Sequence, residues 1–187
     1  GKDQDGGAES PWLYQRWDSP NASQLEARVA ALEGAEAAVA FASGMAAATG
    51  LMLHLLKHGD HLLIADTCYV GVAEFVRNKL PALGIDVSLV NTADNAAVAA
   101  AMTPRTKLVW LETPSNPILR LADIAAIAEI AHAGGALLAV DSTFATPVST
   151  RPLELGADFV MHSLTKYLCG HGDAMGGIIA GKRQGML

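Results

Sequence analysis

Short apolar runs alternate with helix-forming stretches along almost the whole chain, and this alternation constrains the fold more than any other feature. Seven runs of four to six residues have the composition of β-strands and lie at 37–41, 61–65, 85–90, 107–111, 136–140, 158–161 and 177–180. Helices are predicted between most of them, at 44–57, 72–80, 95–102 and 122–133. A further helix is predicted to start with a capping box at residues 23–26 and to end at Gly34.

The strand-like runs are apolar throughout rather than alternating with polar residues, which is typical of strands buried on both faces. Strands that alternate with helices favour right-handed crossovers and a parallel sheet. The sequence therefore predicts an α/β fold, with a mostly parallel seven-stranded sheet and helices on both of its faces. Residues 37–56 carry no formal charge and are long enough to cross a membrane, but Ser43 and Gly44 interrupt them, so a strand, a turn and a buried helix are expected there.

Charge and cysteine content narrow the class of protein. The formal charge of −6 and the lack of any run of lysines or arginines argue against a nucleic-acid partner. The two cysteines, Cys68 and Cys169, form no CxxC motif, so neither a disulfide framework nor a zinc site is indicated, and a reducing cytoplasm is the expected compartment. No charged segment followed by an apolar one opens the chain, so we expect neither a signal peptide nor a membrane partner.

Polar residues follow five of the predicted strands at the point where each strand ends. The five clusters are residues 43–45, Asp66 with Tyr69, residues 112–117, residues 141–143 and residues 163–166. In open sheets of this class ligands bind outside the carboxyl ends of the strands. The sequence therefore predicts a small-molecule site at which these clusters converge.

Lys166 is the first candidate for covalent chemistry, because it follows a strand-like run and the hydroxyls of Ser163 and Thr165 precede it. Burial of an ammonium lowers its pKa and leaves a nucleophilic amine, and such lysines form Schiff bases with carbonyl compounds, pyridoxal phosphate (PLP) among them. The two hydroxyls would suit the cofactor's phosphate. The alternative is a surface lysine, which is the common situation for this residue type.

Three further positions each have a functional and an ordinary interpretation. The helix that starts at Gly44 offers backbone N–H groups to an anion, or it has a simple cap. Asp141 ends a buried strand and would suit the ring nitrogen of PLP, or it caps the next turn. Tyr69 could stack on a planar cofactor or fill the core. Neither GxxxxGK[ST] nor GxGxxG is present, which disfavours a nucleotide-binding protein.

Four of the five polar clusters lie within ordered blocks that are distributed between residues 25 and 177. The blocks read LEARVAALEGAEAAVAFASGMAA, KLVWLETPSNP, VDSTFATPVSTRPLELGAD and HSLTKYLCGHGDAMGG. From about Tyr14 to Gly177 the chain resembles the PLP enzymes of cysteine and methionine metabolism, a family that includes cystathionine γ-lyase, cystathionine γ-synthase, methionine γ-lyase and homoserine-ester sulfhydrylases. The resemblance implies pyridoxal 5'-phosphate as cofactor and the large domain of PLP fold type I.

Carried over by position, the resemblance implies that Lys166 is the Schiff-base lysine and that Asp141 pairs with the pyridinium nitrogen. Tyr69 matches the residue that stacks on the cofactor ring and joins Lys166 as a catalytic residue. Asn116 matches a residue near the cofactor's phenolic oxygen. The remaining expected cofactor ligands, most of them for the phosphate, are Ser43, Gly44, Met45, Thr143, Ser163 and Thr165.

The resemblance also implies how the chain is divided. Residues 1–20 would form an arm in which Tyr14 and Arg16 match a pair that reaches the phosphate of a neighbouring subunit's cofactor. A homodimer or homotetramer with shared active sites is therefore expected. Residues 21–187 would form an incomplete PLP-binding domain, because the family's smaller C-terminal domain, which holds the arginine for the substrate carboxylate, is missing from this chain.

The activity implied by the resemblance is a PLP-dependent carbon–sulfur lyase that performs γ-elimination on cystathionine or methionine. One alternative is γ-replacement, as in cystathionine γ-synthase or a homoserine-ester sulfhydrylase, and another is a catalytically silent PLP-binding or assembly module. The chain has Val70 and Ser142 where the family commonly has glycine and asparagine. It has Gly71 where methionine γ-lyases often have cysteine, which weakens a strictly methionine-specific interpretation.

Overall fold

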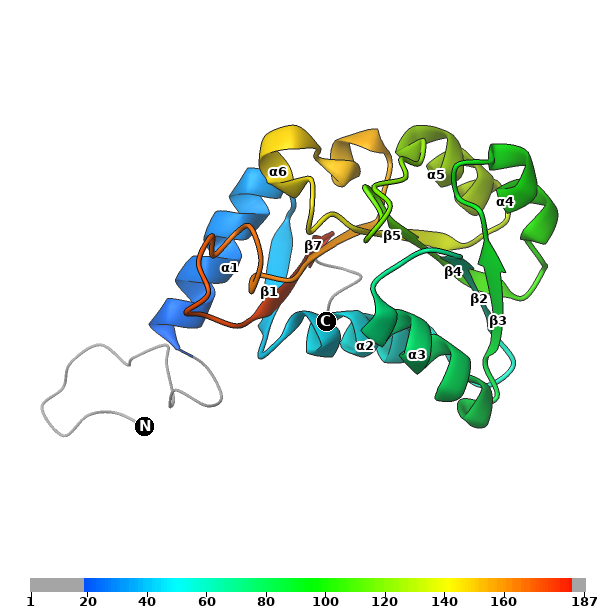
Figure 1. Cartoon of the computed structure of the whole chain (residues 1–187), viewed down its shortest axis with the longest axis horizontal. Helices are drawn as coiled ribbons and strands as arrows, with labels where there is room; N and C mark the ends of the chain where they lie inside the picture. Colours follow the sequence, from blue (N-terminus) through cyan, green and yellow to red (C-terminus); the bar gives the residue numbers. More distant parts are fainter. Residues whose placement is uncertain (1–18, 183–187) are drawn as a thin grey trace, which may run out of the picture.

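The computed structural model describes residues 19–182, which form one seven-stranded sheet with helices on both faces (Figure 1). The strands are β1 (Ala37–Phe41), β2 (His61–Ala65), β3 (Asp86–Val90), β4 (Thr106–Glu112), β5 (Leu137–Asp141), β6 (Phe159–His162) and β7 (Gly177–Gly181). The α-helices are α1 (Pro20–Glu33), α2 (Gly44–Leu55), α3 (Val70–Asn78), α4 (Asn95–Ala101), α5 (Ile124–Ala133) and α6 (Thr146–Ser149), and two 3₁₀ helices are η1 (Pro81–Leu83) and η2 (Pro152–Leu155). The predicted α/β architecture is confirmed.

The strands lie in the order β1-β7-β6-β5-β4-β2-β3. The neighbours from β6 to β3 pair in parallel, whereas β7 is antiparallel to both β6 and β1. The sheet is therefore mostly parallel, as predicted. The direction of β7 leaves the carboxyl ends of the other strands at one edge, and this edge is where the polar clusters begin.

The two faces of the sheet are covered by different helices. Helices α2 and α3 pack on one face, and α4 and α5 lie on the opposite face (Figure 1). The fully buried Trp110 belongs to the first apolar cluster with Met52, and its neighbour Leu111 belongs to the second with Ile127. Successive side chains of β4 thus enter opposite layers, which explains why its sequence is apolar without alternation.

Helix α1 covers the β1, β7 and β6 end of the sheet, and it begins one turn earlier than expected. The side chain of Ser19 caps it and Pro20 is its first residue, so the prediction of a capping box at residues 23–26 is wrong. Proline at the first helical position costs no hydrogen bond, and this favours the earlier start. The Glu26 carboxylate instead accepts the backbone N–H of Ala40 in β1 at 2.9 Å.

The uncharged stretch at residues 37–56 is a strand, a turn and a helix, as predicted, namely β1 followed by α2. Across residues 19–182, none of the helices combines the length and the apolar character that crossing a membrane would require. Helix α6 and the two 3₁₀ helices were not predicted, because each spans only three or four residues and has no hydrophobic period to detect.

Candidate active site

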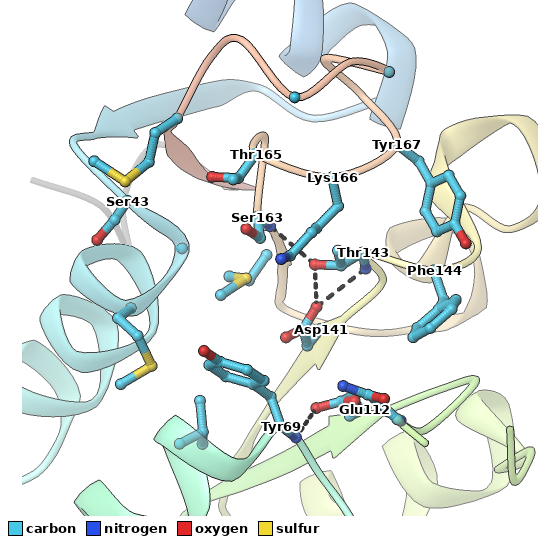
Figure 2. Close-up of a pocket in the computed structure, with 18 of the residues that line it drawn as sticks. Ser43, Tyr69, Glu112, Asp141, Thr143, Phe144, Ser163, Thr165, Lys166 and Tyr167 are labelled. Atoms are coloured by element: carbon cyan, nitrogen blue, oxygen red, sulfur yellow. Dashed lines mark hydrogen bonds between the residues drawn. The ribbon is translucent and has the colours of Figure 1, made fainter. Parts of the chain in front are cut away.

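A cavity of about 760 Å³ opens at the carboxyl edge of the sheet (Figure 2). The sequence-predicted residues that line it are Ser43, Gly44, Met45, Tyr69, Asn116, Asp141, Thr143, Ser163, Thr165 and Lys166. The lining residues that were not selected as individual site residues are Val72, Glu112, Phe144, Met161, Tyr167, Gly170, His171, Gly172 and Met175, of which Glu112 opens the predicted cluster at residues 112–117. All five polar clusters contribute a residue, so their predicted convergence is confirmed.

The N-terminus of α2 forms one side of the cavity. Ser43 caps the helix by accepting the Ala46 N–H at 3.1 Å, whereas the N–H groups of Gly44 and Met45 have no acceptor within the helix. A Cβ at Gly44 would lie 2.7 Å from the Cβ of Ser163, so a residue without a side chain is required for the loop after β6 to approach this closely. Free N–H groups beside a serine hydroxyl suit an anion such as phosphate.

Asp141 lies on the floor of the cavity at the end of β5 and is 6 % exposed. Its Oδ1 accepts hydrogen bonds from the Thr143 backbone N–H at 3.0 Å and the Thr143 hydroxyl at 2.6 Å. The same hydroxyl accepts the Ser163 N–H at 2.9 Å and so joins the ends of β5 and β6. Burial raises the pKa of Asp141, while Thr143 and the charge of His162 oppose that shift. A cation in the cavity would therefore be strongly attracted to this carboxylate.

Lys166 lies in the loop after β6, and its side chain extends toward Thr143 and Asp141 (Figure 2). Of the two situations considered for Lys166, the exposed one is observed, because the residue lies on the turn that its N–H closes with the Ser163 carbonyl at 3.2 Å. Among residues 19–182, no carboxylate forms an ion pair with Lys166. Its amine is therefore available to a ligand in the cavity.

The hydroxyl of Thr165 is already engaged within the protein. It donates to the Gly176 carbonyl at 3.2 Å and accepts the Gly176 N–H at 3.1 Å. These two bonds tie the loop after β6 to the start of β7. Thr165 thus lines the cavity as predicted, but its hydroxyl oxygen also holds the loop after β6 against Gly176.

Tyr69 and Glu112 form the wall opposite Lys166 (Figure 2). Glu112 is the last residue of β4 and lies in register with Asp141 on β5. Burial and the neighbouring Asp141 raise the pKa of Glu112 to about 7, while backbone N–H groups oppose the shift. Glu112 was predicted only as the first residue of the cluster at residues 112–117 and was given no role of its own, although a carboxylate at the end of an apolar strand was the same signal that identified Asp141.

Two aromatic residues of the lining were also missed. Phe144 directly follows Thr143, and Tyr167 directly follows Lys166. Their ring centroids are 5.7 Å apart with an interplanar angle of 50°, so the loops after β5 and β6 are joined by an aromatic contact at the cavity. Their only sequence signal was adjacency to the selected residues.

Some residues of the predicted clusters do not line the cavity, Asp66 and Ser142 among them. Asp66 forms an ion pair with Arg120 at 2.6 Å, and Ser142 is fully buried beside the cavity floor. Tyr14 and Arg16 lie outside the described residues, so their expected contact with a neighbouring subunit stays a prediction.

Comparison with known proteins places the chain among relatives of several activities. It is 48% identical over 174 residues to an O-succinylhomoserine sulfhydrylase of Pseudomonas aeruginosa, an alignment that covers 93% of this chain and 43% of the relative. It is 45% identical over 177 residues to an L-methionine gamma-lyase of Pseudomonas putida, covering 95% of this chain and 44% of the relative. The chain thus spans less than half the length of these relatives.

Solved structures agree with the sequence comparison. The crystal structure of metB from Corynebacterium glutamicum superposes with a TM-score of 0.94 at 40% identity, covering 100% of this chain and 48% of that one. A cystathionine gamma-lyase from Lactobacillus plantarum, complexed with L-serine, gives a TM-score of 0.91 at 40% identity, covering 99% of this chain and 48% of that one. The expected large domain of PLP fold type I is thereby confirmed. The family model for Cys/Met metabolism PLP-dependent enzymes matches residues 2–186, and the chain belongs to that family.

Proposed function

We propose that the protein is a PLP-dependent carbon–sulfur lyase that performs γ-elimination on cystathionine or methionine. The observation that carries this proposal is the placement around one cavity of a buried carboxylate and a lysine amine that forms no ion pair within residues 19–182, with a helix N-terminus at its side. Family membership and the methionine and cystathionine γ-lyases among the relatives support it.

The residues present fit the cofactor. The N–H groups of Gly44 and Met45 and the hydroxyl of Ser163, which the missing Cβ of Gly44 allows to lie close together, suit a phosphate. Asp141, whose Oδ2 receives no hydrogen bond from residues 19–182, suits a protonated ring nitrogen. Lys166 would hold the aldehyde carbon, and the ring of Tyr69 would lie against the cofactor ring.

PLP, when bound, would supply an aldehyde that reacts with primary amines and a protonated ring that withdraws electrons from a substrate carbon. The amine of Lys166 can accept the proton of the substrate's Cα and carry it toward Cγ. The hydroxyl of Tyr69 can donate a proton to the departing thiolate sulfur. Asp141 keeps a proton on the ring nitrogen. Each of these acid–base tasks contributes about 10²–10⁴-fold to the rate.

γ-Replacement on an activated homoserine is the second candidate function. It is favoured by the similarity to the O-succinylhomoserine sulfhydrylase and to a probable cystathionine gamma-synthase of Herpetosiphon aurantiacus, which is 46% identical over 173 residues. Gly71, where methionine γ-lyases often have cysteine, is consistent with it. Both reactions use the same lysine, carboxylate and tyrosine, so the residues of this cavity serve either one.

Product analysis with the full-length protein separates the candidates. With cystathionine or methionine, elimination releases 2-oxobutanoate, ammonia and a thiol. With O-succinylhomoserine and a thiol, replacement releases succinate and a new thioether without an oxo acid. We expect the first result. Replacement without elimination would favour the second candidate, and bound PLP with no product from any substrate would leave the silent binding module.

The assembly and location are also proposals. We expect a homodimer or homotetramer in which Tyr14 and Arg16 of the arm, residues 1–20, reach the cofactor phosphate of a neighbouring subunit. The incomplete PLP-binding domain, residues 21–187, would be joined by a smaller C-terminal domain that supplies the substrate-carboxylate arginine. The free thiols of Cys68 and Cys169 support a reducing compartment, which we take to be the cytoplasm.

A further inference from the structure

The carboxylate of Glu112 makes two hydrogen bonds to backbone groups of separate loops. Its Oε2 accepts the Tyr69 N–H at 2.6 Å, and its Oε1 accepts the Asn116 N–H at 2.7 Å. Tyr69 belongs to the loop after β2, and Asn116 belongs to the loop after β4. Glu112 is only 5 % exposed, so water cannot easily replace either bond. One buried carboxylate therefore fixes the backbone at two residues of the cavity wall.

The Tyr69 backbone is also held by its carbonyl, which accepts the Ala73 N–H of α3 at 3.0 Å. Tyr69 precedes α3 without forming a side-chain cap, and the residue is 42 % exposed. The same two loops are also joined by the ion pair between Asp66 and Arg120, whose side chains are 40% and 29% exposed. Exposed pairs contribute little to the stability of a structure. The buried bonds to Glu112 are therefore the stronger link between the two loops.

We propose that Glu112 is a positioning residue that, in its ionised form, holds Tyr69 and Asn116 against the cofactor. The inference rests on the proposed function, because it concerns the same cavity. Both hydrogen-bond partners of Glu112 are N–H donors, so both of its oxygens must act as acceptors. A protonated carboxyl places an O–H opposite one of these N–H groups and loses one of the two bonds.

The groups around Glu112 determine the pH at which its carboxylate is protonated. Asp141 faces Glu112 from β5, and Cys68 and Tyr69 face it from the loop after β2. Lys166, from the loop after β6, lines the same cavity. Burial and Asp141 raise the pKa of Glu112 to about 7, whereas the pKa of Cys68 is raised to about 12, so its thiol stays neutral. Around pH 7, Glu112 therefore changes charge, whereas the Cys68 thiol stays neutral.

The test is the affinity of the full-length protein for PLP, measured by absorbance titration in wild type and Glu112→Gln. Glutamine has one oxygen acceptor, and its amide group opposes the second N–H. We expect the variant to bind PLP about 10- to 100-fold more weakly above pH 7, which is the effect of losing a charged acceptor. Below about pH 7 the wild-type carboxyl is protonated, so the ratio of the two dissociation constants should shrink. A ratio of one, or a ratio that does not change with pH, would overturn the inference.

A matched control is Asp66→Asn, which removes the exposed link between the same loops without altering the cavity lining. Its PLP affinity should stay within about twofold of wild type. An effect as large as that of Glu112→Gln would show that any link between the loops suffices, and would contradict the role given to Glu112.

Amide hydrogen exchange of the wild-type protein tests the same contacts without a variant or a cofactor. The Tyr69 and Asn116 amides should be protected above pH 7 and lose protection, relative to intrinsic rates, as Glu112 is protonated. Unchanged protection would overturn the inference even if Glu112→Gln failed to fold. Failure of the wild-type protein to bind PLP would instead refute the proposed function, while the exchange result would still decide the role of Glu112.

Discussion

The contact between Glu33 and His162 should be among the most costly in the molecule to break. The carboxylate oxygen Oε1 of Glu33, at the end of α1, lies 2.5 Å from Nε2 of His162, at the end of β6. Their side chains are 0% and 1% exposed, and neither Oε2 nor Nδ1 has another hydrogen-bond partner among the described residues. Within residues 19–182, each of the two side chains therefore has the other as its only hydrogen-bond partner.

Glu33→Ala removes the partner and leaves a polar ring buried without a hydrogen bond. Breaking one side of such a buried pair costs about 3–5 kcal/mol. For a domain of this size each kcal/mol lowers Tm by about 2–4 °C, so the expected drop is on the order of 10 °C. The measurement is the free energy of unfolding of the full-length protein in urea, with Tm as a second readout.

A double-mutant cycle separates this pair from the loss of volume. Glu33→Leu and His162→Leu should each be strongly destabilising, whereas the double variant should recover much of the loss, because two apolar side chains leave no unpaired polar group. Additive single effects, or a Glu33→Ala cost below about 1 kcal/mol, would refute the reasoning, since that is the range of ordinary surface changes.

Gly44→Ala should lower the free energy of unfolding by about 1–3 kcal/mol, because its Cβ would lie 2.7 Å from the Cβ of Ser163. The control is Gly172→Ala, because a Cβ at Gly172 meets nothing within 4 Å. Equal effects of the two substitutions would contradict the close approach of Ser163 to Gly44. Gly71→Cys should reduce kcat/KM by up to about 100-fold, because its Cβ would lie 2.8 Å from the Tyr69 ring and would displace it. Unchanged kinetics would contradict the need for the Tyr69 ring at its present position. The folded-state pKa of Glu112 is raised from 4.5 to about 7, so the native state binds this proton more tightly than the unfolded chain does. Its contribution is complete below pH 4.5 and is lost by pH 7, so stability should fall by about 3 kcal/mol over that window in wild type but not in Glu112→Gln, as urea titrations across pH can measure.

The sheet was predictable because each strand is a short apolar run bounded by polar residues. The bounds of β1 and β2 agree with the sequence expectation at both ends, and β4 extends by one residue on each side. Local signals were less reliable at helix starts. The Ser23 motif satisfies the capping-box pattern, but Ser19 followed by Pro20 offers an earlier start that a pattern search centred on glutamate overlooks.

The candidate site was predictable where a residue sits at the end of a strand or carries a family motif, as Asp141 and Lys166 do. It was less predictable where a role depends on contacts across the sheet. Glu112 acts on Tyr69, which lies 43 positions away in the sequence, and no spacing rule connects them. The sequence also left open whether Lys166 is buried or exposed, because the turn that separates it from β6 is not visible in composition.

The central claim is that the amine of Lys166 carries the cofactor in the cavity above Asp141. The most direct test treats the full-length protein with PLP and borohydride, digests it, and locates the reduced pyridoxyl group by mass spectrometry. We expect the added mass on the peptide that contains Lys166, and no specific addition in Lys166→Ala. A modification at another lysine, with Lys166 unlabelled, would contradict the account.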